Sequence, residues 1–249
     1  MNTVEAHIDL KRICMCFGSK EVLRDVGLTV QRGHVGVVIG GSGTGKTTLL
    51  RIMMGLQRPT SGEVWIDGEN IAPMPESELR RVRGRCGMVF QYSALLDSLT
   101  VMQNVALPLK EHEPLGRAER EARVREMLES LGLAGTEHQY PAELSGGMRK
   151  RVGLARALIR KPSLIMYDEP ASGLDPLTAR RVDDLILETR DRFGVTSVVI
   201  SHSMAQAVRI ADRMYVLDAG AVAAEGTVAE LKAQGGSLVQ QYFEASRVD

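Results

Sequence analysis

The residues best suited to chemistry form a glycine-rich run between two apolar stretches. Residues 40–47 match the pattern G-x-x-x-x-G-K-T, after a Val/Ile-rich run and before a helical pattern. Glycines let the backbone curl so that successive N–H groups point at phosphate oxygens, and the following helix adds its positive end. In such a loop the lysine reaches the β- and γ-phosphates and the threonine hydroxyl after it ligates Mg²⁺. We therefore expect a nucleoside triphosphate to be bound by Gly40, Gly41, Ser42, Gly43, Thr44, Gly45, Lys46, Thr47 and Thr48.

The nearest alternative for this loop is a dinucleotide-binding turn. The Gly-x-Gly-x-x-Gly spacing of that turn is absent, and the lysine favours a triphosphate.

A pair of carboxylates ends a second apolar stretch. Residues 164–167 are typical of a buried strand, and Asp168 and Glu169 follow them directly. A strand in a parallel sheet delivers its C-terminal residues to the ligand crevice. We expect Asp168 to hold Mg²⁺ and Glu169 to polarise the attacking water as general base.

A further anion site is indicated at residues 144–148. Ser145, Gly146 and Gly147 precede a helical pattern and would offer a hydroxyl and N–H groups at a helix N-terminus. An ordinary helix cap is the alternative.

The elements that must position these residues alternate along the chain. Apolar runs predict strands at 35–39, 62–68, 86–90, 164–167, 197–200 and 214–217, and periodic patterns predict helices at 46–56, 117–131, 176–192 and 204–210. Between residues 91 and 150 the pattern is helical. The chain is thus expected to be an α/β core with an inserted helical lobe.

Composition limits the class of protein. The 249 residues carry 31 Lys+Arg against 31 Asp+Glu, which argues against a strongly basic nucleic-acid surface. The longest stretch without charged residues, 193–208, is too polar to span a membrane, and the N-terminus does not resemble a secretory signal. Three cysteines, Cys14, Cys16 and Cys86, form no disulfide framework and fit a reducing cytosol.

The order of the motifs resembles the nucleotide-binding subunit of ABC transporters over essentially the whole chain. The motifs are the phosphate loop, residues 89–91 (Val-Phe-Gln), 144–147 (Leu-Ser-Gly-Gly), Asp168 with Glu169, 172–175 (Ser-Gly-Leu-Asp), and 201–202 (Ser-His). The resemblance implies one ATPase domain over 1–249, a P-loop NTPase with a RecA-like core and an antiparallel β subdomain. It divides the chain into a core of 1–91 and 160–249 and a helical lobe of 92–159.

The resemblance also implies roles. Two subunits would close head to tail, with ATP between the phosphate loop of one and Ser145, Gly146 and Gly147 of the other. Gln91 would bridge Mg²⁺ or water to the helical lobe, Asp175 would line the dimer seam, and His202 would contact the γ-phosphate and orient the water. Phe17 would stack on adenine. A structural role for His202 and a core position for Phe17 are the alternatives.

Met148 stands where most of the family has Gln, followed by Arg149, Lys150 and Arg151. This run resembles the ATPases of Mce/Mla-type lipid-transport systems, as do Asn104, Val105, Ala106, Pro108 and Leu109 before Glu111 and His112. That subgroup implies phospholipid transport, a membrane permease, a small regulatory subunit, an Mce-type lipid-binding protein, and a peripheral place on the cytoplasmic face of the inner membrane. The basic run itself is open to two interpretations, a solvated helix start or an inter-subunit contact.

Other cargoes and another class of ATPase are the competing hypotheses. Amino acids, lipoproteins or drugs would leave the ATPase the same, because membrane and periplasmic partners choose the cargo. A soluble ABC ATPase acting on DNA or ribosomes is disfavoured, since Lys46 and Ser145 are only 99 residues apart and a single ATPase unit is present.

Two segments are candidates for contact with a permease. Residues 91–109 are unusually apolar for a loop, with some side chains expected to pack in the lobe and others to line a groove for a partner helix: Leu95, Leu96, Leu99, Val101 and Met102. Residues 237–248 have apolar side chains at helical spacing, which suits a docking helix or packing on the chain's own core.

Overall fold

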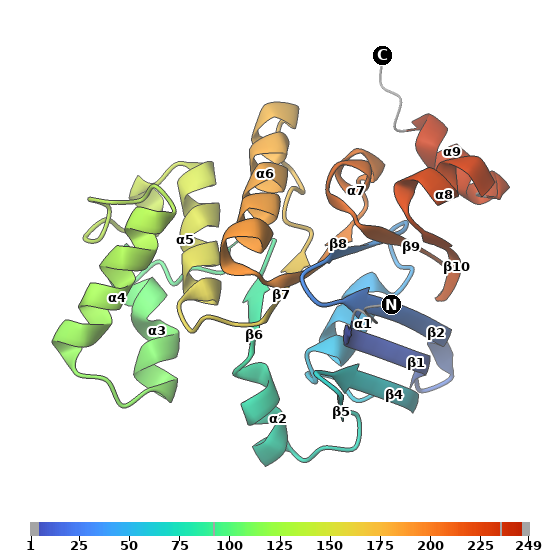
Figure 1. The fold of residues 1–249 in the computed structure, drawn as a ribbon, viewed down its shortest axis with the longest axis horizontal. Helices are drawn as coiled ribbons and strands as arrows, with labels where there is room; N and C mark the ends of the chain where they lie inside the picture. The colour runs from blue at the N-terminus through green and yellow to red at the C-terminus, as the bar shows by residue number, and fades with distance from the viewer. Residues whose placement is uncertain (1–4, 92, 235, 246–249) are drawn as a thin grey trace.

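The computed structural model describes residues 5–91, 93–234 and 236–245. Within them a six-stranded sheet runs through the middle of the molecule in the order β10-β9-β3-β8-β7-β6 (Figure 1). All neighbours are parallel except the β9–β10 hairpin. The strands are β3 (Val35–Ile39), β6 (Cys86–Val89), β7 (Leu164–Asp168), β8 (Thr196–Ser201), β9 (Arg213–Asp218) and β10 (Ala221–Gly226). Strands β3 and β8 are buried along their whole length, as expected for a parallel sheet covered on both faces.

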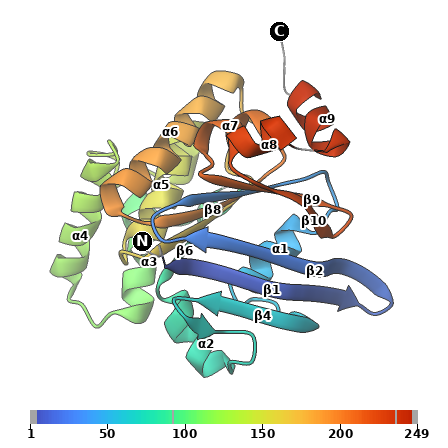
Figure 2. The same ribbon diagram turned by 45° about the vertical axis from the view of Figure 1, so that its right-hand side comes forward.

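An antiparallel sheet of order β2-β1-β4-β5 lies below the parallel sheet (Figures 1 and 2). Its strands are β1 (Ala6–Phe17), β2 (Lys20–Gln31), β4 (Ser61–Ile66) and β5 (Glu69–Asn70). Ile8 on β1 pairs with Val30 on β2 and with Ile66 on β4, and all three are buried. Helix α1 (Lys46–Met53) adds Leu49 and Leu50 to the same apolar cluster, which also contains side chains of the parallel sheet. The cluster therefore fixes α1, and with it the loop that precedes it.

Helices cover the other face of the parallel sheet and extend from one side of it. Figure 1 shows α6, α7, α8 and α9 above the sheet and α3, α4 and α5 together at the left. The bounds are α2 (Glu76–Arg83), α3 (Val101–His112), α4 (Arg117–Ser130), η1 (Pro141–Glu143), α5 (Gly146–Leu158), α6 (Pro176–Phe193), α7 (Met204–Ile210), α8 (Val228–Gln234) and α9 (Ser237–Ala245). One apolar cluster includes residues of α3, α4 and α5 as well as β3, β7 and β8, so the helical lobe and the sheet share a core. The boundaries 1–91, 92–159 and 160–249 stay a prediction.

The expected α/β architecture is confirmed, and most expected elements lie within two residues of the observed ones. The strand at 35–39 and the helix at 204–210 have the bounds that the sequence predicts. The helix expected over 46–56 ends earlier, at Met53, because Gly55 adopts a left-handed φ of 62°.

Both segments proposed for permease contact differ from a plain exposed loop. Helix α3 begins inside the first segment, so Val101 is fully buried and Leu99 is half-buried, whereas Leu96 remains 49% exposed. In the second segment α9 packs Val239 and Phe243 into the main core, which supports the alternative of packing on the chain itself. Residues 246–248 of that segment lie outside the described residues. Within the described part of the chain, no helix is long and apolar enough to cross a membrane.

Candidate functional site

The phosphate loop joins β3 to α1 and is confined by its neighbours. A Cβ placed on Gly40 would lie 2.3 Å from the Leu217 carbonyl oxygen on β9. A Cβ placed on Gly45 would lie 2.6 Å from Leu23 Cδ2 on β2, and Gly45 has a left-handed φ of 103°. Only glycine fits these two positions, so the loop is held between β9 and β2.

Lys46 is the buried cation of the loop. Its side chain is 8% exposed, and Nζ donates to the carbonyl oxygens of Gly40 at 2.8 Å and Gly41 at 2.7 Å. Desolvation lowers the pKa of Lys46, and the charges of Glu169 and Asp168 act in the opposite direction. The ammonium group is therefore bonded to the phosphate loop and is influenced by the charges of the two carboxylates.

Asp168 and Glu169 stand at the carboxyl end of β7. Desolvation, and secondly the charge of Glu169, raise the pKa of Asp168, while Arg51 and Lys46 lower it. The oxygen atoms that could coordinate a cation beside the loop belong to the exposed Thr47 hydroxyl, the Asp168 carboxylate and the Gln91 amide. These are hard oxygen ligands, and Mg²⁺ usually takes one or two carboxylates together with phosphates, so the set fits Mg²⁺.

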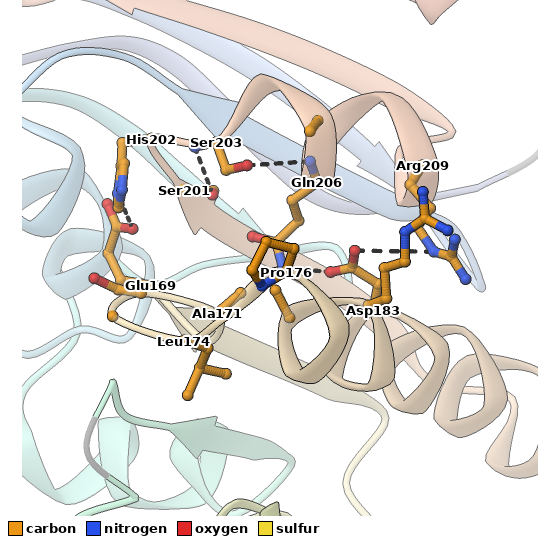
Figure 3. A pocket seen from close by; sticks show the side chains of 15 residues that line it. Glu169, Ala171, Leu174, Pro176, Asp183, Ser201, His202, Ser203, Gln206 and Arg209 are labelled. Carbon is orange, nitrogen blue, oxygen red and sulfur yellow. Dashed lines mark hydrogen bonds and ion pairs between the residues drawn. The ribbon is translucent and has the colours of Figure 1, made fainter. Parts of the chain in front are cut away.

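Glu169 is fixed on both its backbone and its side chain. It has a φ of 48°, an uncommon conformation for a residue with a side chain, and its N–H donates to the Ile200 carbonyl at 3.0 Å. His202 Nδ1 lies 2.6 Å from Glu169 Oε2 (Figure 3). Because a carboxylate can only accept, Nδ1 carries the hydrogen of this bond. The structure thus joins two of the residues that the sequence singles out.

Gln91 reaches the same turn from β6. Its Nε2 donates to Ser172 Oγ at 3.1 Å, and the Ser172 N–H donates to the Glu169 carbonyl at 3.1 Å. Ser172 was not among the expected site residues, although it opens the motif at 172–175. Its presence in that motif was the available signal.

Ser145 caps the N-terminus of α5. Its Oγ accepts from the Met148 N–H at 3.3 Å, and both Ser145 and Gly146 are exposed. Among the described residues no hydrogen bond joins Ser145, Gly146 or Gly147 to the phosphate loop. Met148 packs against the main core, which accounts for an apolar side chain there.

Asp175 and Phe17 have local roles that the structure makes plain. Asp175 caps α6, where Oδ1 accepts from the Leu177 and Thr178 N–H groups, both at 3.0 Å. A hydrogen bond from the Thr178 side chain, followed by these backbone hydrogen bonds, lowers the pKa of Asp175. Phe17 ends β1 and is 50% exposed, so it is not a core residue and its ring is free to meet a ligand.

An open pocket of about 710 Å³ extends from the Glu169–His202 pair between α6 and α7. Figure 3 shows Asp183, Gln206 and Arg209 at its other end. Gln206 Nε2 donates to Asp183 Oδ1 at 2.6 Å, and both residues are buried. Nothing in the sequence pattern singles out this pair, because each member sits on a helix among ordinary core positions.

These motifs and their placement agree with the comparison to known proteins. A model of the ABC transporter family matches residues 23–172, more than half of the chain. The chain belongs to the ABC transporter family. Similar relatives are the methionine import ATP-binding proteins MetN of Rhizobium etli, 46% identical over 89% of this chain, and of Corynebacterium efficiens, 45% identical over 90%. The chain spans 60% and 62% of the length of these two relatives.

Solved ABC proteins have the same fold. The bacterial ABC transporter cassette MJ0796, solved as a dimer bound to ADP and Pi, is 32% identical with a TM-score of 0.78, covering 89% of this chain and 98% of that one. The protein cbiO1 of Clostridium perfringens, part of an ABC transporter complex, is 25% identical with a TM-score of 0.85, covering 98% of this chain and 97% of that one. The P-loop NTPase fold of ABC type is thereby confirmed, and the chain is an ABC-type ATPase domain.

The finer resemblance to lipid-transport ATPases is not supported by these ABC relatives, whose names specify methionine import. The residues behind that expectation have a local explanation in this chain. Met148 fills a core position, and Asn104 is fully buried and binds backbone groups of Leu96, Leu99 and Thr100. These packing and hydrogen-bonding roles are structural, so the residues do not indicate which cargo is transported.

Proposed function

We propose that this chain is the ATP-hydrolysing subunit of an ABC transporter for an amino acid. The observation that carries the ATPase part is the Glu169–His202 pair at the end of β7, together with the buried Lys46 that is bonded to the phosphate loop and feels the charge of Glu169. A carboxylate held in one orientation beside a phosphate-binding loop is what a general base for water requires.

The reaction follows from these residues. Lys46 and the loop N–H groups bind the β- and γ-phosphates, and Phe17 stacks on the adenine. Glu169 accepts a proton as water attacks the γ-phosphorus, the bond to the β-phosphate oxygen breaks, and ADP and phosphate result. His202 orients Glu169 and contacts the γ-phosphate. Thr47, Asp168 and Gln91 would hold Mg²⁺, which neutralises phosphate charge when bound.

The site is completed by a second copy of the chain. Ser145, Gly146 and Gly147 are exposed or half-buried at the α5 N-terminus and make no hydrogen bond to the phosphate loop of their own chain. An exposed helix N-terminus is a good partner for a phosphate. The dimeric state of the related cassette supports head-to-tail closure, with Asp175 at the seam.

A membrane permease is the proposed partner, and the chain would lie on the cytoplasmic face of the membrane. Leu96 and Phe90, which flank the Gln91 segment, are 49% and 41% exposed and offer apolar surface beside Gln91, the residue proposed to bridge Mg²⁺ or water to the helical lobe. The lobe would pivot at Gln91 as ATP closes the dimer.

Methionine or a similar amino acid is the cargo favoured by the relatives, which are named for methionine import. Phospholipid, with a regulatory subunit and an Mce-type lipid-binding protein, is a second candidate that rests on Met148 and the basic residues after it. The cargo test is to purify the chain with its membrane subunit in lipid vesicles and measure ATP hydrolysis with added methionine-loaded binding protein or with transferred phospholipid. Stimulation by the amino acid supports the first candidate, and transfer of phospholipid alone refutes it.

The ATPase itself is tested with Glu169→Gln. The amide cannot accept the proton, so turnover should fall by about 100-fold or more while ATP binding is retained. An ATP-bound dimer should accumulate in size-exclusion chromatography. Hydrolysis at the wild-type rate would show that Glu169 is not the base.

A further inference from the structure

The side chains of the basic run Arg149, Lys150 and Arg151 all donate to backbone carbonyls of the same chain, although Arg149 is exposed. Arg149 Nη1 donates to the Leu144 carbonyl at 2.6 Å, and Arg151 Nη1 donates to the Leu131 carbonyl at 3.2 Å. Lys150 Nζ donates to the carbonyl oxygen of Pro170. Arg149 therefore bonds within the turn that leads into α5, whereas Lys150 and Arg151 tie α5 to segments about 20 residues away in the chain.

Lys150 is the unusual member of this run. Its side chain is half-buried beside Phe90, Leu154 and Tyr167, and burial lowers the pKa of Lys150 with no charged group opposing it. Within the described part of the chain no carboxylate forms an ion pair with it. A half-buried ammonium without a counter-ion needs strong hydrogen-bond acceptors, and the Pro170 carbonyl is the one it contacts.

Pro170 directly follows the proposed base. Glu169 holds a left-handed φ of 48°, which persists only where the surroundings fix it. The Glu169 N–H donates to Ile200, and its carbonyl accepts from Ser172. Pro170 has no N–H to contribute, so the hydrogen bond from Lys150 to its carbonyl is what fixes the next peptide group.

The same helix also holds the segment after Gln91. Arg156 donates to the carbonyls of Ser93 and Ala94, both at 2.7 Å, and these two residues have left-handed φ values of 60° and 44°. Lys150 and Arg156 are six residues apart, about 9 Å along a helix. Helix α5 thus forms hydrogen bonds to the loop after Glu169 and to the loop after Gln91, the two residues proposed to act near the γ-phosphate.

We propose that Lys150 is a positioning residue that makes the placement of Glu169 depend on α5. Ser145 caps the N-terminus of α5, the end proposed to meet the partner's nucleotide. Through Lys150, contact of α5 with the partner's nucleotide would affect the position of Glu169, the proposed general base in the same chain as Lys150. This inference rests on the proposed function, because it assigns a mechanical role within ATP hydrolysis.

The test compares Lys150→Met, which keeps the length of the stem and removes the donor, with Lys150→Arg, which keeps a donor. Displacement of a reacting group by about 1 Å can cost about 100-fold in rate. We expect Lys150→Met to lower kcat by about 10- to 100-fold, to leave the dissociation constant for ATP within about twofold, and Lys150→Arg to recover most of kcat.

Arg151→Met is the matched control. It removes a donor from the same turn of α5, but that donor binds the carbonyl of Leu131, the residue after α4, and does not contact the Glu169 turn. It should leave kcat within about twofold of wild type even where the melting temperature falls. A wild-type kcat for Lys150→Met, or equal losses of kcat in Lys150→Met and Arg151→Met, would refute the positioning role alone. Absence of ATP hydrolysis by the wild-type dimer would refute the proposed function and this inference together.

Discussion

At the scale of single residues, the phosphate loop sets Lys46 against its own backbone. The ammonium donates to the Gly40 and Gly41 carbonyls, so a bound phosphate competes with two existing hydrogen bonds rather than meeting a free cation. A phosphate carries full negative charge, and charge-assisted hydrogen bonds are roughly twice as strong as neutral ones. The loop is therefore ordered beforehand and still favours the ligand.

Lys46→Ala removes this cation and should weaken ATP binding itself. Hydrogen bonds to charged groups contribute about 1.5–3 kcal/mol, which corresponds to a rise of about 10- to 100-fold in the dissociation constant. Titration with a fluorescent ATP analogue measures it. Glu169→Gln serves as the control, because it should bind ATP normally, and an unchanged affinity for Lys46→Ala would remove Lys46 from the phosphate site.

Residues proposed to act through their own side-chain chemistry could be singled out from type and spacing. Lys46, Asp168 and Glu169 belong to this group, and their roles stay a prediction. Lys150 could not, because its partner is a backbone carbonyl 20 residues away, and a carbonyl leaves no mark in the sequence. The Gln206–Asp183 pair was not predicted for a similar reason, since the sequence alone does not show that α6 lies beside α7.

At the scale of elements, segments with a clear apolar pattern were predictable, including the highly charged helix α4, whereas α2 was not predicted and α3 was not delimited. Helix α2 was not predicted, because its only buried residues are Leu79 and Val82 and the rest of the segment is largely charged. Helix α3 lies in the expected helical lobe, but its bounds were not predicted because residues 91–109 were interpreted as an apolar loop, although Thr100 and Gln103 form a capping box that the sequence displays. It also continues through Pro108, which normally argues against a helix interior.

The two sheets are joined by a buried histidine on β1. His7 Nδ1 is hydrogen-bonded to the Thr196 hydroxyl of β8 at 2.5 Å, and Nε2 lies 3.1 Å from Asp67 and 3.3 Å from Ser163. Desolvation lowers the pKa of His7 below 6.5; Asp67 opposes this, and Arg32 and Arg85 reinforce it. The folded protein therefore binds this proton less readily than the unfolded chain.

The free energy of unfolding should consequently depend on His7 in mildly acidic solution. Above pH 6.5 both states leave His7 neutral and its contribution is fully present; as the pH falls below 6.5 the unfolded chain gains the proton first and stability is lost, by at most about 1.4 kcal/mol per pH unit. Urea unfolding of wild type and of His7→Gln at pH 7.5 and 5.5 measures this. The variant should show a smaller pH dependence, and equal slopes would contradict the assignment.

At the scale of the whole molecule, the core and the lobe are linked by one apolar cluster and by the hydrogen bonds of α5. The segment between β6 and α3 lies at their junction. It carries Gln91 at one end and the exposed Leu96 further on, and Asn104 holds the Leu96 backbone at both its N–H and its carbonyl. Leu96 thus has a backbone fixed by Asn104 and an exposed side chain, which suits the proposed contact with a permease.

Leu96→Asp should release the chain from its permease without unfolding it. The backbone contacts to Asn104 do not involve the Leu96 side chain, so the melting temperature should stay within about 3 °C, as for most substitutions at exposed positions. A charge placed in an apolar contact loses that contact and leaves itself desolvated, so recovery of the neighbouring membrane subunit in a pull-down should fall by about tenfold or more. Leu96→Met is the matched control, since it keeps an apolar side chain of similar size and should retain the partner.

Undiminished recovery with Leu96→Asp would place the permease contact elsewhere on the molecule. Loss of recovery with both variants would mean that the shape of Leu96, and not its apolar character, determines docking.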